Sequence, residues 1–124
     1  MTKTTEQIGS ELAGRVKGDV LGDIYNRVAF STDASIYSIR PQCVVAPKDE
    51  VDVLAVVQYA YRNQIPIAPR GAGSGLAGES LSTGIVLDFR RYMNRILRIT
   101  DNGLFAVCQP GVVLDKLNES LIKY

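Results

Sequence analysis

The chain has 124 residues, of which 46% are hydrophobic and 22% charged, and its 14 basic and 13 acidic side chains leave a net charge of +1. This composition is typical of a folded globular protein and argues against disorder, while the near-neutral charge argues against a general binder of nucleic acid or anionic membranes. The sequence contains no histidine, which excludes a Ser-His-Asp triad, a histidine-ligated zinc site and histidyl attachment of a cofactor within these residues.

The first predicted element is a short helix near the amino terminus. The helix is indicated by Ile8, Leu12 and Val16, which recur on one helical face, and Thr5 can cap its amino end. Three glycines then weaken regular structure: Gly14, Gly18 and Gly22. The polar run after residue 30 and the breaker Pro41 predict that residues 27–40 form a connection along the surface. We therefore assign residues 1–40 to an amino-terminal helix and connection.

A strand and a capped helix are predicted next. Residues 42–46 form a short β-branched run that Pro47 ends, which is typical of a buried strand. Asp49 is the predicted N-cap of the following helix, with Asp52 at the reciprocal third position. Four side chains recur at helical spacing: Val53, Val56, Val57 and Ala60.

The end of this helix leads into a second strand. We expect the helix to run to about Asn63, which can take the left-handed closing conformation, because Pro66 cannot continue it. Residues 65–68 are the next predicted strand. The short connections make this a strand–helix–strand unit, so the two strands should be parallel.

The remaining elements predict an α+β fold, a small parallel-containing sheet with helices packed on it. Residues 84–89 form a continuous apolar strand, and residues 96–100 and 104–109 flank Asp101, Asn102 and Gly103, a strong signal for a tight hairpin. In the last segment, residues 112–124, one helical face carries Leu114, Leu117 and Leu121. This segment has no C-cap glycine and no closing strand follows it, so we expect the chain to be truncated within its fold.

The segment most indicative of function is the glycine-rich loop at residues 69–78, which carries Gly71, Gly73, Gly75 and Gly78. Alternating glycines permit positive φ angles and let bare backbone approach a ligand, and successive N–H groups then converge on an anion. The usual large anion for such a loop is a pyrophosphate, for which Ser74 adds a hydroxyl donor. The alternative is a flexible surface loop, which the tight fit between two apolar strands disfavours.

Two common nucleotide-binding motifs do not explain this loop. Residues 73–78 match GxGxxG, but a dinucleotide-binding fold needs a helix to begin inside that motif, and the short polar stretch after Gly78 leads directly into a strand. The ATP-binding loop needs a Gly-Lys-Ser/Thr ending, and no such lysine follows Gly75 or Gly78.

Six short motifs in order resemble one flavoprotein family. They are residues 31–35 (STDAS), 40–47 (RPQCVVAP), 65–78 (IPIAPRGAGSGLAG), 86–88 (VLD), 93–96 (MNRI) and 109–112 (QPGV). Their order and spacing resemble the start of the FAD-binding domain of the vanillyl-alcohol oxidase and para-cresol methylhydroxylase superfamily, nearest to the branch of D-lactate dehydrogenases and glycolate oxidase FAD subunits. The resemblance implies that residues 41–124 are the truncated amino-terminal part of such a domain.

The resemblance also implies a cofactor and its contacts. The loop would bind the pyrophosphate of FAD through backbone amides, Ser80 would lie on the flavin side, and the chain would pass close to FAD at residues 110 and 111. The implied cofactor-binding residues are Pro69, Arg70, Gly71, Ala72, Gly73, Ser74, Gly75, Leu76, Gly78, Ser80, Pro110 and Gly111. Covalent members carry a histidine where this chain has Ser74, so we expect non-covalent FAD. Glu79 departs from the family pattern, since many relatives have glycine there.

The activity implied is oxidation of a 2-hydroxy acid, such as D-lactate or glycolate, by hydride transfer to the flavin. Some relatives pass electrons to an iron–sulfur domain or subunit, which is therefore a candidate partner. The family's catalytic residues lie beyond the equivalent of Tyr124, so the chain alone should be inactive, and its open sheet edge invites self-association. Two other hypotheses remain: a nucleotide-binding module without redox chemistry, and a structural fragment that binds nothing.

The remaining features are interpreted as structural. Cys43 and Cys108 lie in apolar runs and are predicted to be buried thiols of a reducing compartment. A basic cluster is interpreted as a solvated turn and strand edge, with a phosphate or membrane-surface patch as the alternative: Arg90, Arg91, Arg95 and Arg98. Asp33 and Asp88 are taken as structural, and the apolar face of the last helix as core.

The sequence also bears on location. No apolar run approaches the roughly 20 residues that span a bilayer. Residues 1–14 lack the apolar core of a signal peptide and the arginine-rich pattern of a transit peptide. We expect a cytoplasmic location, with peripheral attachment to the inner membrane through partners as the alternative.

Overall fold

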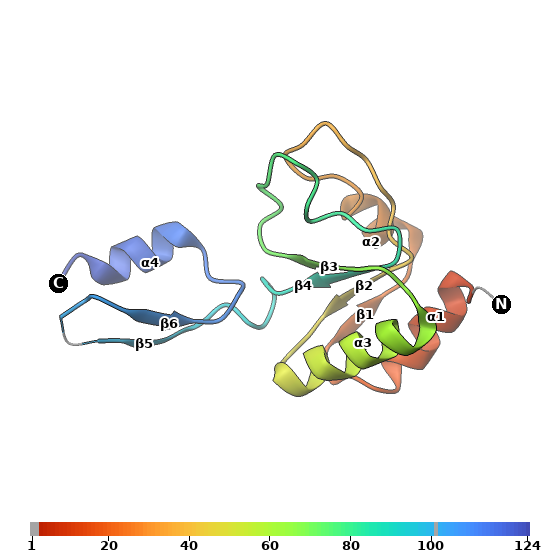
Figure 1. The fold of residues 1–124 in the computed structure, drawn as a ribbon, viewed down its shortest axis with the longest axis horizontal. Coiled ribbons are helices and arrows are strands. Elements are labelled where there is room, and N and C mark those ends of the chain that lie inside the picture. The colour runs from red at the N-terminus through yellow and green to blue at the C-terminus, as the bar shows by residue number, and fades with distance from the viewer. Residues whose placement is uncertain (1–2, 101) are drawn as a thin grey trace.

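The structure is a computed structural model that describes residues 3–100 and 102–124. In chain order the elements are α1 (Thr5–Ala13), β1 (Asp19–Leu21), α2 (Ile24–Ala29), β2 (Cys43–Ala46), α3 (Glu50–Asn63), β3 (Ile67–Arg70), β4 (Ile85–Asp88), β5 (Ile96–Ile99), β6 (Ala106–Cys108) and α4 (Leu114–Leu121). The predicted α+β class is confirmed (Figure 1). No helix among the described residues is long and apolar enough to cross a membrane.

The central sheet has four strands in the order β1-β2-β4-β3. The strands β2 and β3 run parallel, as the strand–helix–strand pattern predicts, but β4 lies between them and is parallel to both. All four residues of β4 are buried. An apolar run without alternation suits a strand covered on both faces, which explains its central place.

Helices α1 and α3 cover one face of this sheet, and α2 with two long loops lies on the other (Figure 1). The hydrophobic core between the helices and the sheet includes Ile8 and Leu12 of α1, Val56 of α3, and Val45 and Ile85 of the strands, none of which is exposed to solvent. Burying each such side chain contributes about 1.5–3 kcal/mol relative to leaving it exposed.

The cap of α1 differs from the prediction. Thr4, not Thr5, is the N-cap: its hydroxyl accepts the N–H of Gln7, and the Gln7 side chain accepts the N–H of Thr4. This reciprocal pair satisfies two N–H groups that the first helical turn leaves free. Thr4 and Thr5 have the same capping propensity. Thr4 is the N-cap because Gln7, three residues after it, can complete the reciprocal pair.

Two elements were missed in the amino-terminal part. The strand β1 pairs antiparallel with β2, so residues on both sides of position 40 share one sheet. Helix α2 begins after Asp23, whose carboxylate accepts the N–H of Asn26 at 3.0 Å. Gly18 was interpreted as a breaker, but a Cβ there would collide with the carbonyl oxygen of Ala46, so it permits the close approach of β1.

Helix α3 begins as predicted, with the Asp49 carboxylate accepting the N–H of Asp52 at 3.0 Å. Its end corrects the prediction: Gln64, at φ 54°, takes the left-handed conformation instead of Asn63. The N–H of Ile65 then donates to the Ala60 carbonyl at 2.9 Å, which completes the helix terminus. The strand β3 therefore starts two residues later than predicted and takes in Pro69 and Arg70.

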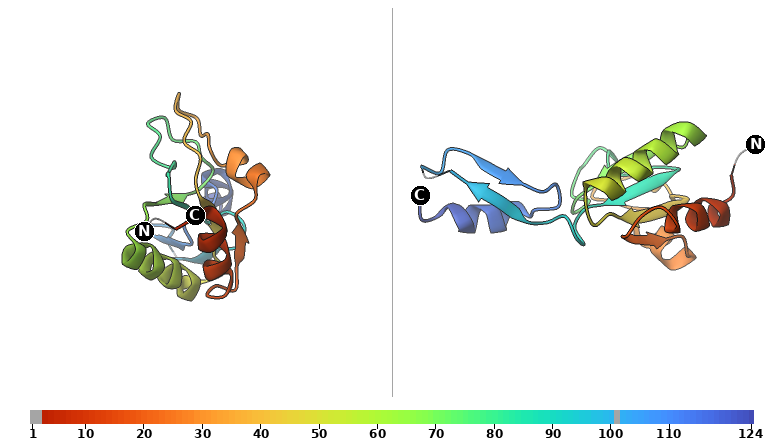
Figure 2. Two further views of the ribbon diagram at one scale, coloured as in Figure 1. Left: turned by 90° about the vertical axis from the view of Figure 1, so that its right-hand side faces the viewer. Right: turned by 90° about the horizontal axis from the view of Figure 1, so that it is seen from below.

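The predicted hairpin is present as β5 and β6, which pair antiparallel. Position Asp101 of its turn lies outside the described residues, and Gly103 has φ 68°. The hairpin and α4 project from the four-stranded sheet as a separate lobe (Figures 1 and 2), and Tyr124 returns to contact Gly103. None of the residues of α4, all of which are described, is buried. The interpretation of its apolar face as core of the sheet is therefore wrong.

Both cysteines are free thiols. Cys43 is buried in β2, and this burial raises the pKa of its thiol to about 11. Cys108 is half-buried, less than predicted, because the two-stranded hairpin that carries it has no second layer of strands to cover it.

Candidate functional site

The glycine loop lies at the carboxyl edge of the parallel strands. It follows β3 directly, and the residues after β4 emerge beside it, because β3 and β4 are parallel neighbours that end together at Arg70 and Asp88. Ligands of α/β sheets bind preferentially outside the carboxyl ends of the strands. A cavity of about 320 Å³ lies here, between the loop and the start of α4.

The conformation of the loop is non-helical, as predicted. Between residues 71 and 84, all of which are described, no helix forms, so the GxGxxG match is accidental. Gly73 and Gly78 have φ angles of 69° and 78°, in the region that side chains disfavour. The backbone N–H groups of residues 71–76 donate to no acceptor among the described residues. A run of donors without protein partners is what an anion-binding loop requires.

The segment after α2 holds the loop in place. The N–H of Ala34 donates to the Gly73 carbonyl at 2.9 Å, and the Ser80 hydroxyl donates to the Asp33 carboxylate at 3.0 Å. Gly78 leaves room for the ring of Tyr37. The hydrogen bond from the Ser35 side chain, ahead of those from its backbone and from Ser80, keeps the pKa of Asp33 below its usual value. Asp33 thus has the structural role that the sequence analysis assigned to it.

Arg70 lies beneath the loop as the last residue of β3. Its side chain is only 9% exposed, and its guanidinium carbon is 5.1 Å from the centre of the Phe30 ring. A Cβ at Gly73 would lie 2.5 Å from the Arg70 Nη2 atom, so the guanidinium packs against the bare backbone of the loop. Within the described residues, its buried Nε and Nη1 atoms have no hydrogen-bond acceptor. Burial lowers the pKa of Arg70, and Asp33 opposes that change.

The turn after β6 forms the opposite wall of the cavity. Gly111 is buried, its N–H donates to the Met93 carbonyl at 2.8 Å, and a Cβ there would lie 2.7 Å from the same oxygen. Only glycine therefore lets this turn pass so close to residues 89–93. Residues 112–115 continue the wall into the first turn of α4.

The cavity unites only part of the predicted set. Four of the predicted residues line it: Gly71, Ala72, Ser74 and Gly111. Leu76 is exposed, and Ser80 is buried with its hydroxyl donating to Asp33. These two are among the eight predicted residues that do not line the cavity: Pro69, Arg70, Gly73, Gly75, Leu76, Gly78, Ser80 and Pro110. Arg90 and residues 112–115 also line the cavity and were not predicted from the sequence. The signal for Arg90 in the sequence was its place in the basic cluster, but that cluster was interpreted as a solvated turn and strand edge.

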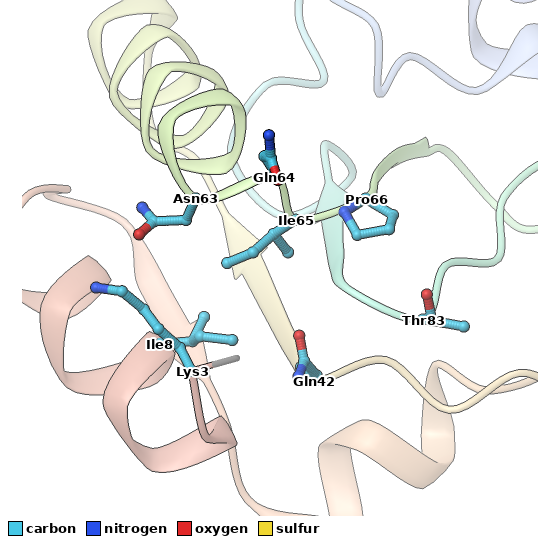
Figure 3. A pocket seen from close by; sticks show the side chains of 8 residues that line it. All are labelled: Lys3, Ile8, Gln42, Asn63, Gln64, Ile65, Pro66 and Thr83. Atoms are coloured by element: carbon cyan, nitrogen blue, oxygen red, sulfur yellow. The ribbon is translucent and has the colours of Figure 1, made fainter. Parts of the chain in front are cut away.

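A larger cavity, of about 470 Å³, lies at the other end of the sheet. Figure 3 shows its lining, in which Gln42, Pro66 and Thr83 precede the parallel strands and Lys3 and Ile8 come from the α1 end. It therefore opens at the amino ends of the strands, where backbone N–H groups are not gathered by a glycine loop. Its size alone does not make it the better candidate, because the backbone N–H groups of Gln42, Gln64 and Ile65 already donate to carbonyls of the chain.

The sequence is similar to a family model and to several characterised proteins. The model for the FAD binding domain matches residues 41–124. A D-2-hydroxyglutarate dehydrogenase of Pantoea ananatis is 37% identical over 84% of this chain and 10% of its own length. The glycolate oxidase subunit GlcD of Bacillus subtilis is 37% identical over 70% of this chain and 19% of its own length. The mitochondrial D-lactate dehydrogenase [cytochrome] of Kluyveromyces lactis is 30% identical over 80% of this chain and 18% of its own length. The chain thus spans less than a fifth of the length of these relatives.

Solved structures show the same fold. An alkyldihydroxyacetonephosphate synthase matches with a TM-score of 0.78 at 25% identity, over 98% of this chain and 25% of that protein. The 6-hydroxy-D-nicotine oxidase of Arthrobacter nicotinovorans matches with a TM-score of 0.72 at 29% identity, over 85% of this chain and 23% of that protein. The geometry of the loop, the family model and these relatives agree with the resemblance seen in the sequence. The chain belongs to the family of FAD-binding domains found in the vanillyl-alcohol oxidase and para-cresol methylhydroxylase superfamily.

Proposed function

We propose that this chain forms the amino-terminal part of the FAD site in an oxidoreductase that oxidises a 2-hydroxy acid. The observation that carries the proposal is the identity of 30–37% to enzymes named for D-2-hydroxyglutarate, glycolate and D-lactate. All three compounds are 2-hydroxy acids. When bound, FAD supplies the hydride acceptor for oxidation of the alcohol carbon.

The residues present fit the pyrophosphate of FAD. The N–H groups of residues 71–76 have no protein acceptor among the described residues, and the Arg70 guanidinium lacks one as well. We propose that the loop amides and the Ser74 hydroxyl hold the phosphates, and that the turn at Pro110 and Gly111 passes beside the cofactor. The cavity of about 320 Å³ is small for a whole dinucleotide, so we propose that polypeptide outside these 124 residues encloses the flavin and adenine.

A partner is also proposed. GlcD is named as a subunit, which supports a multi-component assembly for that relative. We propose an electron-accepting partner of the iron–sulfur type, in the same chain or as a second subunit, and a cytoplasmic location. A nucleotide-binding module without redox chemistry is the competing function, and the presence of flavin in the purified protein separates the two.

The oxidoreductase containing this chain should carry flavin that denaturation releases. We expect absorbance at about 450 nm in the purified enzyme, loss of that absorbance when a 2-hydroxy acid is added without oxygen, and free FAD in the supernatant after acid precipitation. Release is expected because the chain has no histidine and holds Ser74 in its loop. D-Lactate, glycolate and D-2-hydroxyglutarate are the substrates to compare. A purified enzyme without flavin would contradict the proposed function, and flavin retained on a peptide of this chain would contradict the attachment.

Replacing Glu79 by glutamine should strengthen FAD binding. The Glu79 carboxylate accepts the Ala77 N–H at 3.1 Å and lies against Gly75, so it places negative charge beside the amides that would hold the phosphates. Removing a like charge at a partly solvated site should lower the Kd for FAD roughly threefold to tenfold. Equilibrium dialysis of the apoenzyme measures the change. Glu50→Gln, on the exposed first turn of α3, is the matched control and should leave the Kd unchanged.

A further inference from the structure

The glycine loop packs against a buried positive charge, the Arg70 guanidinium, to which no group in the described part of the chain is hydrogen-bonded through Nε or Nη1. Arg70 is 9% exposed, and its Nε and Nη1 atoms have no acceptor among the described residues. An ionised side chain removed from water is costly unless another group pairs with it, and arginine does not lose its proton in proteins. Some partner for this guanidinium is therefore expected in the working state of the protein.

The two nearest carboxylates are already engaged by other groups. Asp33 accepts the N–H of Ser35 and the hydroxyl of Ser80, at 2.8 and 3.0 Å. Asp88 accepts the N–H of Arg90 at 3.1 Å and lies 3.5 Å from the Arg90 Nε atom. Both carboxylates act on Arg70 through space, but neither forms a hydrogen bond with it. The compensation is thus incomplete, and Arg90 adds a second positive charge nearby.

The position of the guanidinium is fixed by its neighbours. The Phe30 ring lies on one side of it, with 5.1 Å between the guanidinium carbon and the ring centre, and the bare backbone of Gly73 lies against its Nη2 atom. Gly73 is itself held by the hydrogen bond from Ala34. The charge is therefore held against the loop at Gly73, within the run of residues whose N–H groups are free, and it needs little rearrangement to act on an anion.

We propose that the Arg70 guanidinium is the fixed positive charge of this anion site and acts on the phosphates of the ligand from beneath the glycine loop. This inference rests on the proposed function and assigns a role to the side chain, whereas the family resemblance implicates only the backbone here. The neutral amides determine where the phosphates lie, and Arg70 contributes charge, which the amides lack. Arg70 thereby acts as a positioning residue for the loop and as the electrostatic partner of the ligand.

The test separates charge from shape in the complete 124-residue chain. Inorganic pyrophosphate is titrated into isotope-labelled protein, and the amide shifts of residues 71–76 are followed by NMR, which detects weak binding. Riboflavin, which has no phosphate, is titrated in parallel. Arg70→Met removes the charge and keeps a long side chain, Arg70→Lys keeps the charge, and Arg70→Gln is a second neutral variant should the methionine variant unfold. Arg62→Met is the matched control, because Arg62 is an exposed cation in the last turn of α3.

We expect the neutral Arg70 variants to bind pyrophosphate roughly tenfold more weakly, and Arg70→Lys and Arg62→Met to stay within about threefold of the wild type. The unliganded shift of the Ala34 amide should be retained, which shows that the loop is still held. Neutral variants that bind pyrophosphate as tightly as the wild type would overturn this inference and leave the proposed function standing. Equal losses of pyrophosphate affinity in the lysine and methionine variants would do the same. If the loop amides of the wild-type chain do not shift with pyrophosphate, the assignment of the phosphates to this loop is overturned, and this inference with it.

Discussion

Replacing Gly73 by valine should cost about 1–3 kcal/mol in the free energy of unfolding and remove most of the FAD affinity. Two independent effects act at this position. The φ angle of 69° is one that a β-branched residue rarely adopts, and a Cβ would lie 2.5 Å from the buried Arg70 guanidinium. The guanidinium has little freedom to retreat, because it is buried and also packs against the Phe30 ring. The loop must therefore deform, which displaces the N–H groups that have no protein acceptor among the described residues.

Thermal unfolding of the chain and FAD binding by the apoenzyme measure these two effects. For a domain of this size the midpoint should fall by about 4 °C for each kcal/mol. Gly71→Val is the matched control for stability, because its φ is not positive and a Cβ at Gly71 meets no atom within 4 Å. Equal melting temperatures for the two variants would show that position 73 is not constrained, and unchanged FAD affinity in Gly73→Val would remove the loop from the cofactor site.

The 124 residues by themselves should bind FAD on the order of a thousandfold more weakly than the complete oxidoreductase, a loss of about 4 kcal/mol. The glycine loop supplies phosphate contacts, but the cavity beside it is open and has about 320 Å³. The lobe of β5, β6 and α4 extends away from the sheet, and only the start of α4 and the turn before it line the cavity (Figure 2). Tight sites enclose about 70–90% of a ligand's surface, which an open cavity of this size does not do for a dinucleotide.

Titration of the chain with FAD, followed by the flavin fluorescence, tests this expectation. Submicromolar binding would show that the site is complete within these residues. The same samples should self-associate, because apolar side chains on α3 are well exposed, among them Val51 at 64% and Tyr61 at 86%, and β3 pairs on one side only. A sedimentation profile of a pure monomer at high concentration would contradict the self-association.

Local signals in the sequence were sufficient for much of the fold. The β-branched run before Pro47, the Asp49 cap and the Asn102-Gly103 turn each carry their own backbone preference, and the elements formed where these signals stand. Where two adjacent residues had similar propensities, as with Thr4 and Thr5 or Asn63 and Gln64, the sequence placed the boundary one residue away. Side-chain hydrogen bonds and helix-end geometry decided those positions.

The sequence by itself predicted an anion-binding loop, because alternating glycines after an apolar strand let the backbone at Gly71, Gly73 and Gly75 approach a ligand. It also determined the family, since six motifs in order are a property of the chain and need no packing to be read. Only the tertiary structure decided that β4 lies between β2 and β3, which brings residues after two strands to one edge. It also decided that the Arg70 guanidinium packs against Gly73 with no acceptor in the described part of the chain, and that the Ser80 hydroxyl donates to Asp33. These facts depend on contacts between residues tens of positions apart, and such contacts follow from strand order and burial, which no local pattern specifies.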